Sequence, residues 1–383
     1  MRKGVLNVSE KVAVSFHNQL SLSQAEYVVA KLWYSVEGVL NCGINPASGA
    51  FEIETMESAK DDAIRTTKAL IDEARTVNPT ESRPLRRSAA APPETLATLT
   101  PWDSGFKEEE ARLLATLDRS VWEIAESFGA RLRQYPSTIP YEVMERSNYL
   151  WEFPQDIFLV YECPHDAAAL QTAKTRRSFR DIVRPTAAMM APAICYHCYA
   201  EYRGQRLSNP MVLTAGGKCF RHESPARLGV WRLSEFHMRE IVFMGPPGFV
   251  HDTRQALIEA VWNWFSELGL VGKVETASDP FYFAGDYVKQ HHQLREGAKY
   301  ELSAALSNDR FVAVASFNDL GRDLCEPFDI TDPSGNIAHS GCVGVGMERM
   351  ARALFAYHGP VVAKWPNAVR EALVSRGSMM MHG

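Results

Sequence analysis

The most constraining feature of this sequence is the run GCVGVGMERMARALFAYHG, residues 341–359. Its first part alternates glycine with apolar residues inside a strand, and apolar residues then recur at helical spacing. Gly359 and Pro360 follow, as is typical of a helix end. A dinucleotide-binding loop does not fit, because its glycines would stand after the strand and not within it. The run predicts a strand that continues into an amphipathic helix, with Arg349 outside the buried stripe and able to contact phosphate.

A second feature is the stretch KCFRHESPARLGVWRLSEFHMREIVF, residues 218–243, which is typical of two strands joined by a loop. Because side chains alternate along a strand, Arg221 and Glu223 are expected on one face of the first strand. The same rule places on one face of the second strand Arg232, Ser234, Phe236, Met238 and Glu240. Guanidinium groups bind phosphate oxygens in pairs and an aromatic ring stacks on a base, so this face suits a nucleoside triphosphate. The alternative is a solvated hairpin with ordinary cross-strand ion pairs.

The composition is that of an ordinary soluble protein, with 383 residues, 46% hydrophobic, 23% charged and a formal charge of −5. Nucleic-acid binders usually carry a basic field, so tRNA is a disfavoured partner. The first residues lack the apolar run of a secretory signal, and no stretch approaches the ~18 apolar residues of a membrane span. We therefore expect a cytoplasmic protein without membrane contact. Seven cysteines without framework spacing argue against a disulfide scaffold.

The organisation predicted from the chain is a module at residues 1–77, a linker at 78–101 and a second domain at 102–383. The segment 78–101 is rich in Pro, Ala, Ser and Thr and has no apolar period. Before it the sequence predicts, in order, strand, helix, strand, strand and helix at 11–17, 21–38, 39–45, 50–56 and 58–75.

This β-α-β-β-α order fits a small ferredoxin-like module, and VEGVLNCGINPASGAFEIE resembles the heavy-metal-associated domain family. The paired cysteines of that family are absent, since the sequence before the first helix is HNQLSLSQ. We expect Cys42 to be a core residue and the module to serve interaction or docking. Deleting residues 1–90 is accordingly expected to spare adenylate formation.

Several motifs of the second domain resemble a known family when they are read in order. FRHE with RLSEFHMRE resembles motif 2 of the class II aminoacyl-tRNA synthetases, and GCVGVGMERMARAL resembles their motif 3. YLWEFPQ, PAICYHCY, ASDPFYF, KYEL and SFN make the chain similar to the bacterial amino acid:carrier-protein ligases, relatives of the zinc-dependent seryl-tRNA synthetases of methanogens. The resemblance covers roughly residues 100–375. It implies an α+β catalytic fold, an antiparallel sheet flanked by helices, and a homodimer.

The resemblance also implies roles for individual residues of an ATP site. Arg221 would hold the α-phosphate, Arg349 the γ-phosphate, and Phe236 would stack on adenine. Ser316 and Asn318 would lie near ATP and its Mg²⁺, although RFVAVAS lacks the acidic residue that synthetases usually have shortly before this serine. The predicted nucleotide site comprises Arg221, Glu223, Arg232, Leu233, Phe236, Ser316, Asn318 and Arg349.

By the same resemblance, zinc would be held by Cys195, Glu240 and Cys342. Two thiolates and one carboxylate are suitable zinc ligands, and three protein ligands leave a fourth position open, as in catalytic zinc sites. That position would take the substrate's α-amino group. The predicted catalytic residues are Arg221, Arg349 and Glu240. Alternatively, Cys195 and Cys198 form half of a structural zinc knuckle, which would need a second ligand pair.

The implied activity is that of a ligase with two steps. An amino acid and ATP would give an aminoacyl-adenylate and pyrophosphate, and the phosphopantetheine thiol of a carrier protein would then take the aminoacyl group. Glycine, alanine or serine are favoured as substrates only by the resemblance. Alternatives are transfer to tRNA, transfer to another acceptor in a biosynthetic pathway, and a non-catalytic regulator that binds amino acids.

Overall fold

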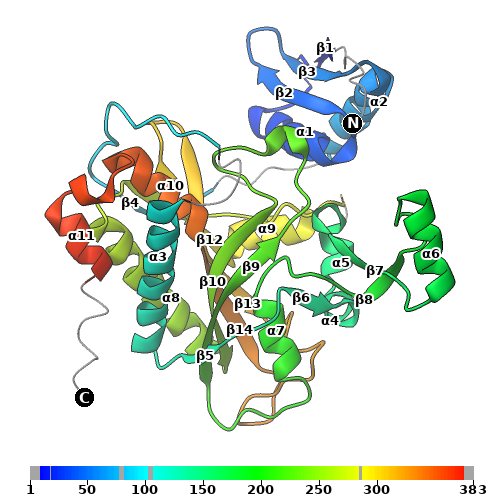
Figure 1. Cartoon of the computed structure of the whole chain (residues 1–383). Coiled ribbons are helices and arrows are strands. Elements are labelled where there is room, and N and C mark those ends of the chain that lie inside the picture. Colours follow the sequence, from blue (N-terminus) through cyan, green and yellow to red (C-terminus); the bar gives the residue numbers. More distant parts are fainter. Residues whose placement is uncertain (1–8, 18, 77–81, 102–106, 284–286, 375–383) are drawn as a thin grey trace.

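The computed structural model describes residues 9–17, 19–76, 82–101, 107–283 and 287–374 (Figure 1). The predicted boundaries near residues 77 and 102 fall outside the described residues. Over the described residues the chain forms a small N-terminal module and a larger main body built on an eight-stranded sheet.

The N-terminal module has the predicted order of elements and stands as a separate blue lobe in Figure 1. Its elements are β1 (Ser9–Ser15), α1 (Leu22–Ser35), β2 (Val39–Asn45), β3 (Ala50–Met56) and α2 (Lys60–Ala74). The strands pair antiparallel in the order β1-β3-β2. Ser21 caps the start of α1: its side chain accepts a hydrogen bond from the backbone N–H of Gln24, and the Gln24 side chain accepts one from the backbone N–H of Ser21, a capping box. Cys42 lies in the apolar core of the module, as predicted.

The predicted linker is wrong for part of its length. Strand β4 (Pro84–Arg87) pairs antiparallel with β11 (Gly272–Thr276) and forms one edge of the large sheet. The backbone N–H of Ala97 also donates to the carbonyl of Ala356 in the main body. A four-residue edge strand is bonded from one side only and here buries no apolar face, so its sequence PLRR carries no alternation that could reveal it. The main body therefore begins before residue 102.

The large sheet has the strand order β4-β11-β12-β13-β14-β10-β9-β5, and its pairs are antiparallel except β5 with β9. The remaining strands are β5 (Arg131–Arg133), β9 (Met211–Phe220), β10 (Glu235–Gly245), β12 (Lys299–Ala305), β13 (Phe311–Gly321) and β14 (His339–Gly346). One face is covered by α3 (Glu108–Ser127), α8 (Pro247–Glu267), α10 (Met347–His358) and α11 (Asn367–Val374) (Figure 1). Their apolar stripes and that face of the sheet make the main core.

The other side of the sheet carries a smaller layer (Figure 1). Its elements are β6 (Thr138–Pro140), α4 (Tyr141–Arg146), α5 (Tyr149–Glu152), β7 (Leu159–Glu162), α6 (Ala167–Arg176), β8 (Arg184–Met190) and α7 (Cys195–Glu201). The three strands form a second sheet in the order β6-β8-β7. Helix α9 (Tyr287–Glu296) follows β11 along the chain. The site described below lies on this side of the large sheet.

The opening sequence feature is realised as predicted. Strand β14 leads directly into α10, in which Met347, Met350, Ala351 and Leu354 are buried. The backbone N–H of Gly359, at φ +82°, closes the helix on the carbonyl of Phe355. The glycines thus belong to a packed central strand and do not form a phosphate-binding loop.

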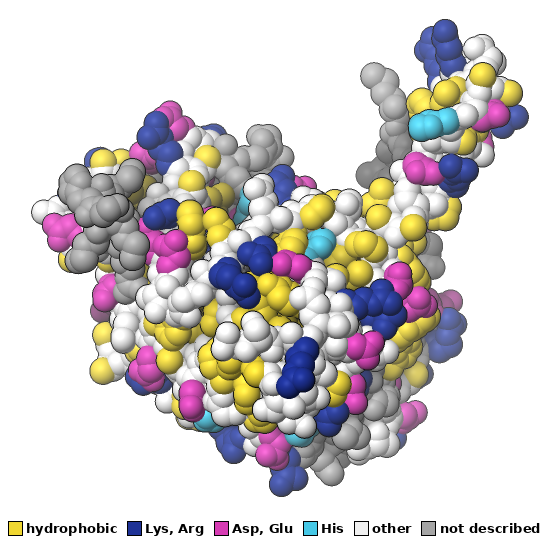
Figure 2. All heavy atoms as spheres, turned by 90° about the horizontal axis from the view of Figure 1, so that it is seen from below, with side chains coloured by type: hydrophobic (Ala, Val, Ile, Leu, Met, Phe, Trp, Pro, Cys, Tyr) yellow, Lys and Arg dark blue, Asp and Glu magenta, His cyan; other side chains and the backbone are white. Residues whose placement is uncertain are grey.

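The surface of the described residues carries charges of both signs. On the face drawn in Figure 2, basic and acidic side chains are interspersed, and the described residues form no continuous basic area there. Across the described part of the chain, every helix is too short or too polar to cross a bilayer.

Candidate functional site

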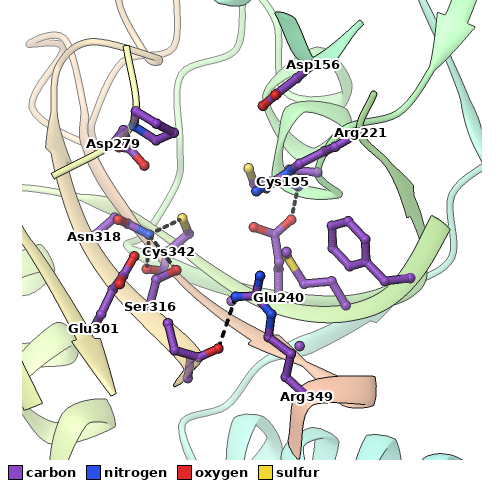
Figure 3. A pocket seen from close by; sticks show the side chains of 18 of the residues that line it. Asp156, Cys195, Arg221, Glu240, Asp279, Glu301, Ser316, Asn318, Cys342 and Arg349 are labelled. Atoms are coloured by element: carbon purple, nitrogen blue, oxygen red, sulfur yellow. Dashed lines mark hydrogen bonds between the residues drawn. The ribbon is translucent and has the colours of Figure 1, made fainter. Parts of the chain in front are cut away.

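A cavity of about 270 Å³ lies on the face of the large sheet opposite the main core (Figure 3). Strand alternation explains which side chains reach it. Ile241 and Phe243 of β10 belong to the main core, whereas Met238 and Glu240 of the same strand line the cavity. Further walls come from strands β12, β13 and β14, helix α7, the start of α10 and neighbouring loops.

Cys195, Glu240 and Cys342 converge at the centre of this cavity (Figure 3). One ligand atom from each, two Sγ and one carboxylate oxygen, lie within 4.8 Å of one another, and all three residues are buried. Neighbouring strands place two of them, because Val242 pairs with Cys342 across β10 and β14. Cys195 opens α7, and its backbone N–H donates to the Glu240 carboxylate. The predicted convergence of these three residues is confirmed.

The chemistry of this group fits a divalent cation. The pKa of the Cys195 thiol is raised well above its ordinary value by a hydrogen bond with Cys342 and by burial. Burial also raises the pKa of Glu240. Three groups that are anionic when deprotonated therefore share one buried place, which favours either protons or a cation there. Two thiolates and a carboxylate are ligands that Zn²⁺ accepts, with a fourth position left over.

The described residues do not support the alternative in which Cys195 and Cys198 form half of a structural zinc knuckle. Cys198 lies one turn further along α7 and packs with Tyr199 and Phe328 in the same apolar cluster as Cys195 and Cys342, but its sulfur is not part of the group of three. Among the His, Cys, Asp and Glu side chains of the described residues, Cys195, Glu240 and Cys342 form the one group of three within ligand distance. Cys198 is a buried thiol whose pKa is raised to about 12 by burial.

The β9–β10 hairpin contributes a second set of cavity residues. Phe236 stands on β10, and the guanidinium carbon of Arg221 lies 5.4 Å from the centre of its ring. Glu223 is 7% exposed, and Arg232 Nη1 donates to its Oε1 at 2.5 Å. All four residues line the cavity, and Leu233 does as well.

The predicted strand bounds of this hairpin need correction. Strand β9 ends at Phe220 and β10 begins at Glu235, so Arg221, Glu223, Arg232 and Ser234 lie in the connecting loop. One further ladder bond, from the N–H of Arg221 to the carbonyl of Ser234 at 2.9 Å, holds the start and end of the loop together. Proline and glycine in SPARLG favour a loop, because proline donates no ladder hydrogen bond.

Arg349 enters the cavity from the start of α10 (Figure 3). Its Nε donates to the carbonyl of Trp231 at 2.8 Å and its Nη1 to that of Ala313 at 3.1 Å. Burial, and then the like charges of Arg232 and Arg221, lower the pKa of Arg349 to about 10. A guanidinium group destabilised by two like charges beside the same cavity favours an anion there, which would be held by the three arginines.

Ser316 and Asn318 line the cavity from β13, and Asn318 Nδ2 lies 3.4 Å from the Sγ of Cys342. Glu301 is the cross-strand neighbour of Ser316 and also lines the cavity. An acidic side chain thus lies beside Ser316 from the adjacent strand, although none precedes Ser316 in the sequence. The motif KYEL contains Glu301, but only the register of β12 against β13 assigns it to the site.

An ion pair of the buried Lys299 with partly exposed carboxylates was also missed by sequence reasoning. Lys299 Nζ lies 2.5 Å from Asp279 and 3.2 Å from Glu301. Burial opposes the charged form of both groups, but their mutual attraction is stronger. The pKa of Asp279 is therefore lowered, mainly by Lys299, and the pKa of Lys299 is raised, mainly by Asp279. Both residues line the cavity. In the sequence, only the motifs ASDPFYF, which contains Asp279, and KYEL, which contains Lys299, indicate that these residues belong to the site.

The antiparallel sheet, the strand-to-helix unit at 339–358 and the arginine-lined cavity define the core domain of a class II aminoacyl-tRNA synthetase. The family model "tRNA synthetase class II core domain (G, H, P, S and T)" matches residues 180–358. Among solved structures, the Methanopyrus kandleri SerRS, crystallised with A. aeolicus tRNASec, has the same fold, with a TM-score of 0.68 and 22% identity over 96% of this chain and 78% of that one.

Curated relatives narrow the assignment within that class. The chain is 31% identical to amino acid–[acyl-carrier-protein] ligase 1 of Bradyrhizobium diazoefficiens over 64% of this chain and 77% of the relative, and equally identical to ligase 2 of that organism over 63% and 73%. It is 28% identical to the type-2 serine–tRNA ligase of Methanopyrus kandleri over 62% of this chain and 50% of the relative. The chain belongs to the family of amino acid–[acyl-carrier-protein] ligases.

Proposed function

We propose that this protein activates an amino acid with ATP as an aminoacyl-adenylate and transfers the aminoacyl group to the phosphopantetheine thiol of a carrier protein. One observation carries the proposal most directly. The Cys195, Glu240 and Cys342 group opens into the same cavity as three arginines, so an amine-binding metal group and an anion-binding group face one space. The names of the Bradyrhizobium relatives support a carrier protein as acceptor.

Cys195, Glu240 and Cys342 would hold Zn²⁺ at the amino-acid end of the cavity. When bound there, zinc would supply a Lewis-acidic position for the uncharged α-amino group of the substrate. Asn318 supports this end by its contact with the Cys342 sulfur. With the amino group fixed, the substrate's carboxylate is limited to a small range of positions, and proximity lowers the barrier to its reaction with ATP.

The other end of the cavity suits ATP. Phe236 offers a ring for adenine, and Glu223, Arg232 and Leu233 line the same cavity. Arg221 would hold the α-phosphate and Arg349 the γ-phosphate. Glu301, Ser316 and Asn318 offer oxygen atoms for Mg²⁺, which prefers oxygen ligands.

The two steps follow from this placement. A carboxylate oxygen of the amino acid attacks the α-phosphorus and pyrophosphate leaves; Arg221 stabilises the charge that develops on the phosphorus oxygens. The thiolate of phosphopantetheine then attacks the carbonyl carbon of the adenylate, AMP leaves, and a thioester forms. No protein nucleophile is required, since the chain's residues bind, orient and stabilise charge. By the same family resemblance the working unit would be a homodimer.

The most direct test is a screen of amino-acid-dependent ATP–pyrophosphate exchange with zinc-loaded protein and a panel of proteinogenic and unusual amino acids. We expect exchange with a small amino acid. Absence of exchange with every amino acid, by protein that retains its zinc, would instead favour the non-catalytic regulator.

A further inference from the structure

The N-terminal module touches the loop between β9 and β10, which lines the cavity. Trp33 and Tyr34, near the end of α1, meet Arg227 of that loop. The guanidinium carbon of Arg227 lies 5.9 Å from the centre of the Trp33 ring and 5.2 Å from that of Tyr34. Arg227 Nη1 also donates to the Tyr34 hydroxyl at 2.7 Å. The module is therefore attached to the hairpin loop by a specific polar and aromatic contact.

The same hydroxyl reaches a cavity residue. Tyr34 donates to Glu223 Oε2 at 2.8 Å, while Arg232 donates to the other oxygen of that carboxylate. Both oxygens of the nearly buried Glu223 are thus held, one from the main body and one from the module. A buried carboxylate oxygen that loses its donor carries a desolvation cost, which would favour another orientation of the side chain.

We propose that Tyr34 is a positioning residue of the ATP site, by which the N-terminal module fixes the Glu223 carboxylate in the orientation that receives the nucleotide. This inference rests on the proposed function. Burial, followed by the nearby Glu223 carboxylate, raises the pKa of Tyr34 to about 12, so the hydroxyl keeps its proton at neutral pH and remains a donor. The module then has a part in adenylation, and loss of residues 1–90 should impair ATP use, contrary to the expectation from the sequence.

The test uses the full-length, zinc-loaded chain and the variant Tyr34→Phe, which keeps the ring against Arg227 and removes only the hydroxyl. The matched control is Tyr27→Phe on the same helix, whose hydroxyl donates to Glu73 inside the module. We measure the dissociation constant of ATP by calorimetry, and the KM values of ATP and amino acid in pyrophosphate exchange.

For Tyr34→Phe we expect the dissociation constant and KM of ATP to rise about three- to tenfold, less than the full value of a hydrogen bond to a charged group, because Tyr34 acts on ATP only through Glu223. The KM of the amino acid should stay unchanged, and Tyr27→Phe should keep wild-type values for both substrates. Unchanged ATP binding in a folded Tyr34→Phe protein would show that the contact only joins the two parts of the chain. An equal rise in both KM values would also overturn the positioning role.

A variant on the loop side of the contact keeps the test valid if Tyr34→Phe does not fold. Arg227→Met removes the donor that anchors the Tyr34 hydroxyl and should also weaken ATP binding; wild-type affinity would contradict the inference. If the wild-type protein binds ATP but shows no pyrophosphate exchange, the proposed function is wrong. The ATP affinities of the wild type and Tyr34→Phe would still test the positioning role of Tyr34. Wild-type protein that does not bind ATP would overturn both.

Discussion

Cys342 is one of the three proposed zinc ligands and stands on the central strand β14, so its replacement tests the metal site directly. Replacing Cys342 with serine exchanges a thiolate for a weak neutral ligand. We expect bound zinc to fall below one equivalent and amino-acid-dependent pyrophosphate exchange to fall about 100-fold or more. Metal analysis of the dialysed protein and the exchange assay measure the two effects. Full exchange by a zinc-free variant would refute binding of the amino group by the metal.

The matched control for this variant is Cys198→Ser, three residues from Cys195 on the same helix. It also places a hydroxyl at a buried thiol position, so both variants lose some stability. Because Cys198 lies outside the group of three, its variant should keep stoichiometric zinc. Loss of zinc in Cys198→Ser would revive the knuckle interpretation.

Arg349 lines the cavity, and burial and two neighbouring arginines destabilise its charge, so a bound anion would stabilise it. Arg349→Ala should raise the KM of ATP about tenfold or more, because a guanidinium group at the cavity wall is lost. Arg349→Lys should restore only part of the affinity, since a lysine cannot reproduce the bonds to the carbonyls of both Trp231 and Ala313. Enzyme kinetics at varied ATP concentration measure both variants.

A control for Arg349 is available in the same helix. Arg352 also donates to a backbone carbonyl, that of Thr100, but it does not line the cavity. Arg352→Ala should therefore reduce stability and leave the KM of ATP unchanged. If the two alanine variants change ATP use equally, Arg349 has no special part in phosphate binding.

At the residue scale, the sequence predicted the side chains that stand within recognisable motifs. Cys195, Glu240 and Cys342 were assigned by motif resemblance, and the structure brings them together. Glu301, Asp279 and Tyr34 were missed for a common physical reason. Each reaches the site, or a residue of the site, through strand register or packing between distant segments, which a single sequence does not encode in a local pattern.

At the scale of elements, β14 illustrates how a glycine allows close packing of the sheet against the main core. A Cβ added at Gly341 would lie 2.3 Å from the Phe243 ring and 2.6 Å from the Asn318 carbonyl oxygen, closer than real atoms approach. Gly341→Ala should lower the free energy of unfolding by about 1–3 kcal/mol, as overpacking does. Thermal or urea unfolding measures this loss. Gly346→Ala on the same strand is the control, since its Cβ meets only the Val314 carbonyl at 3.8 Å; an equal loss there would contradict the packing explanation.

Periodicity predicted the elements that bury an apolar face and failed for those that do not. Strand β14 and helix α10 each carry a strong pattern, and both were predicted in order. Strand β4 buries almost nothing, and its existence depends on the free edge of β11. The arms of the hairpin were predicted as strands, but their bounds were wrong because the ladder ends at the bond between Arg221 and Ser234, and part of the loop beyond it lines the cavity.

At the scale of the whole molecule, the charge distribution bears on the choice of acceptor. The chain carries a formal charge of −5, and basic and acidic side chains are mixed on the face shown in Figure 2. Proteins that bind tRNA gain much of their affinity by releasing counterions from phosphates, which requires a concentrated basic surface. A carrier protein needs only a docking surface and access of its thiol to the adenylate.

We therefore expect the full-length protein to load a phosphopantetheinylated carrier protein with its amino acid and to leave total tRNA uncharged. The measurement is transfer of radiolabelled amino acid at one enzyme concentration to three acceptors: the holo-carrier, the matched apo-carrier and total tRNA. The apo-carrier has the same protein surface without the thiol, so label on the holo form alone identifies the thioester. Hydroxylamine should release that label. Charging of tRNA at a rate equal to or above that of the holo-carrier would identify RNA as the acceptor, and equal labelling of the two carrier forms would exclude the phosphopantetheine thiol.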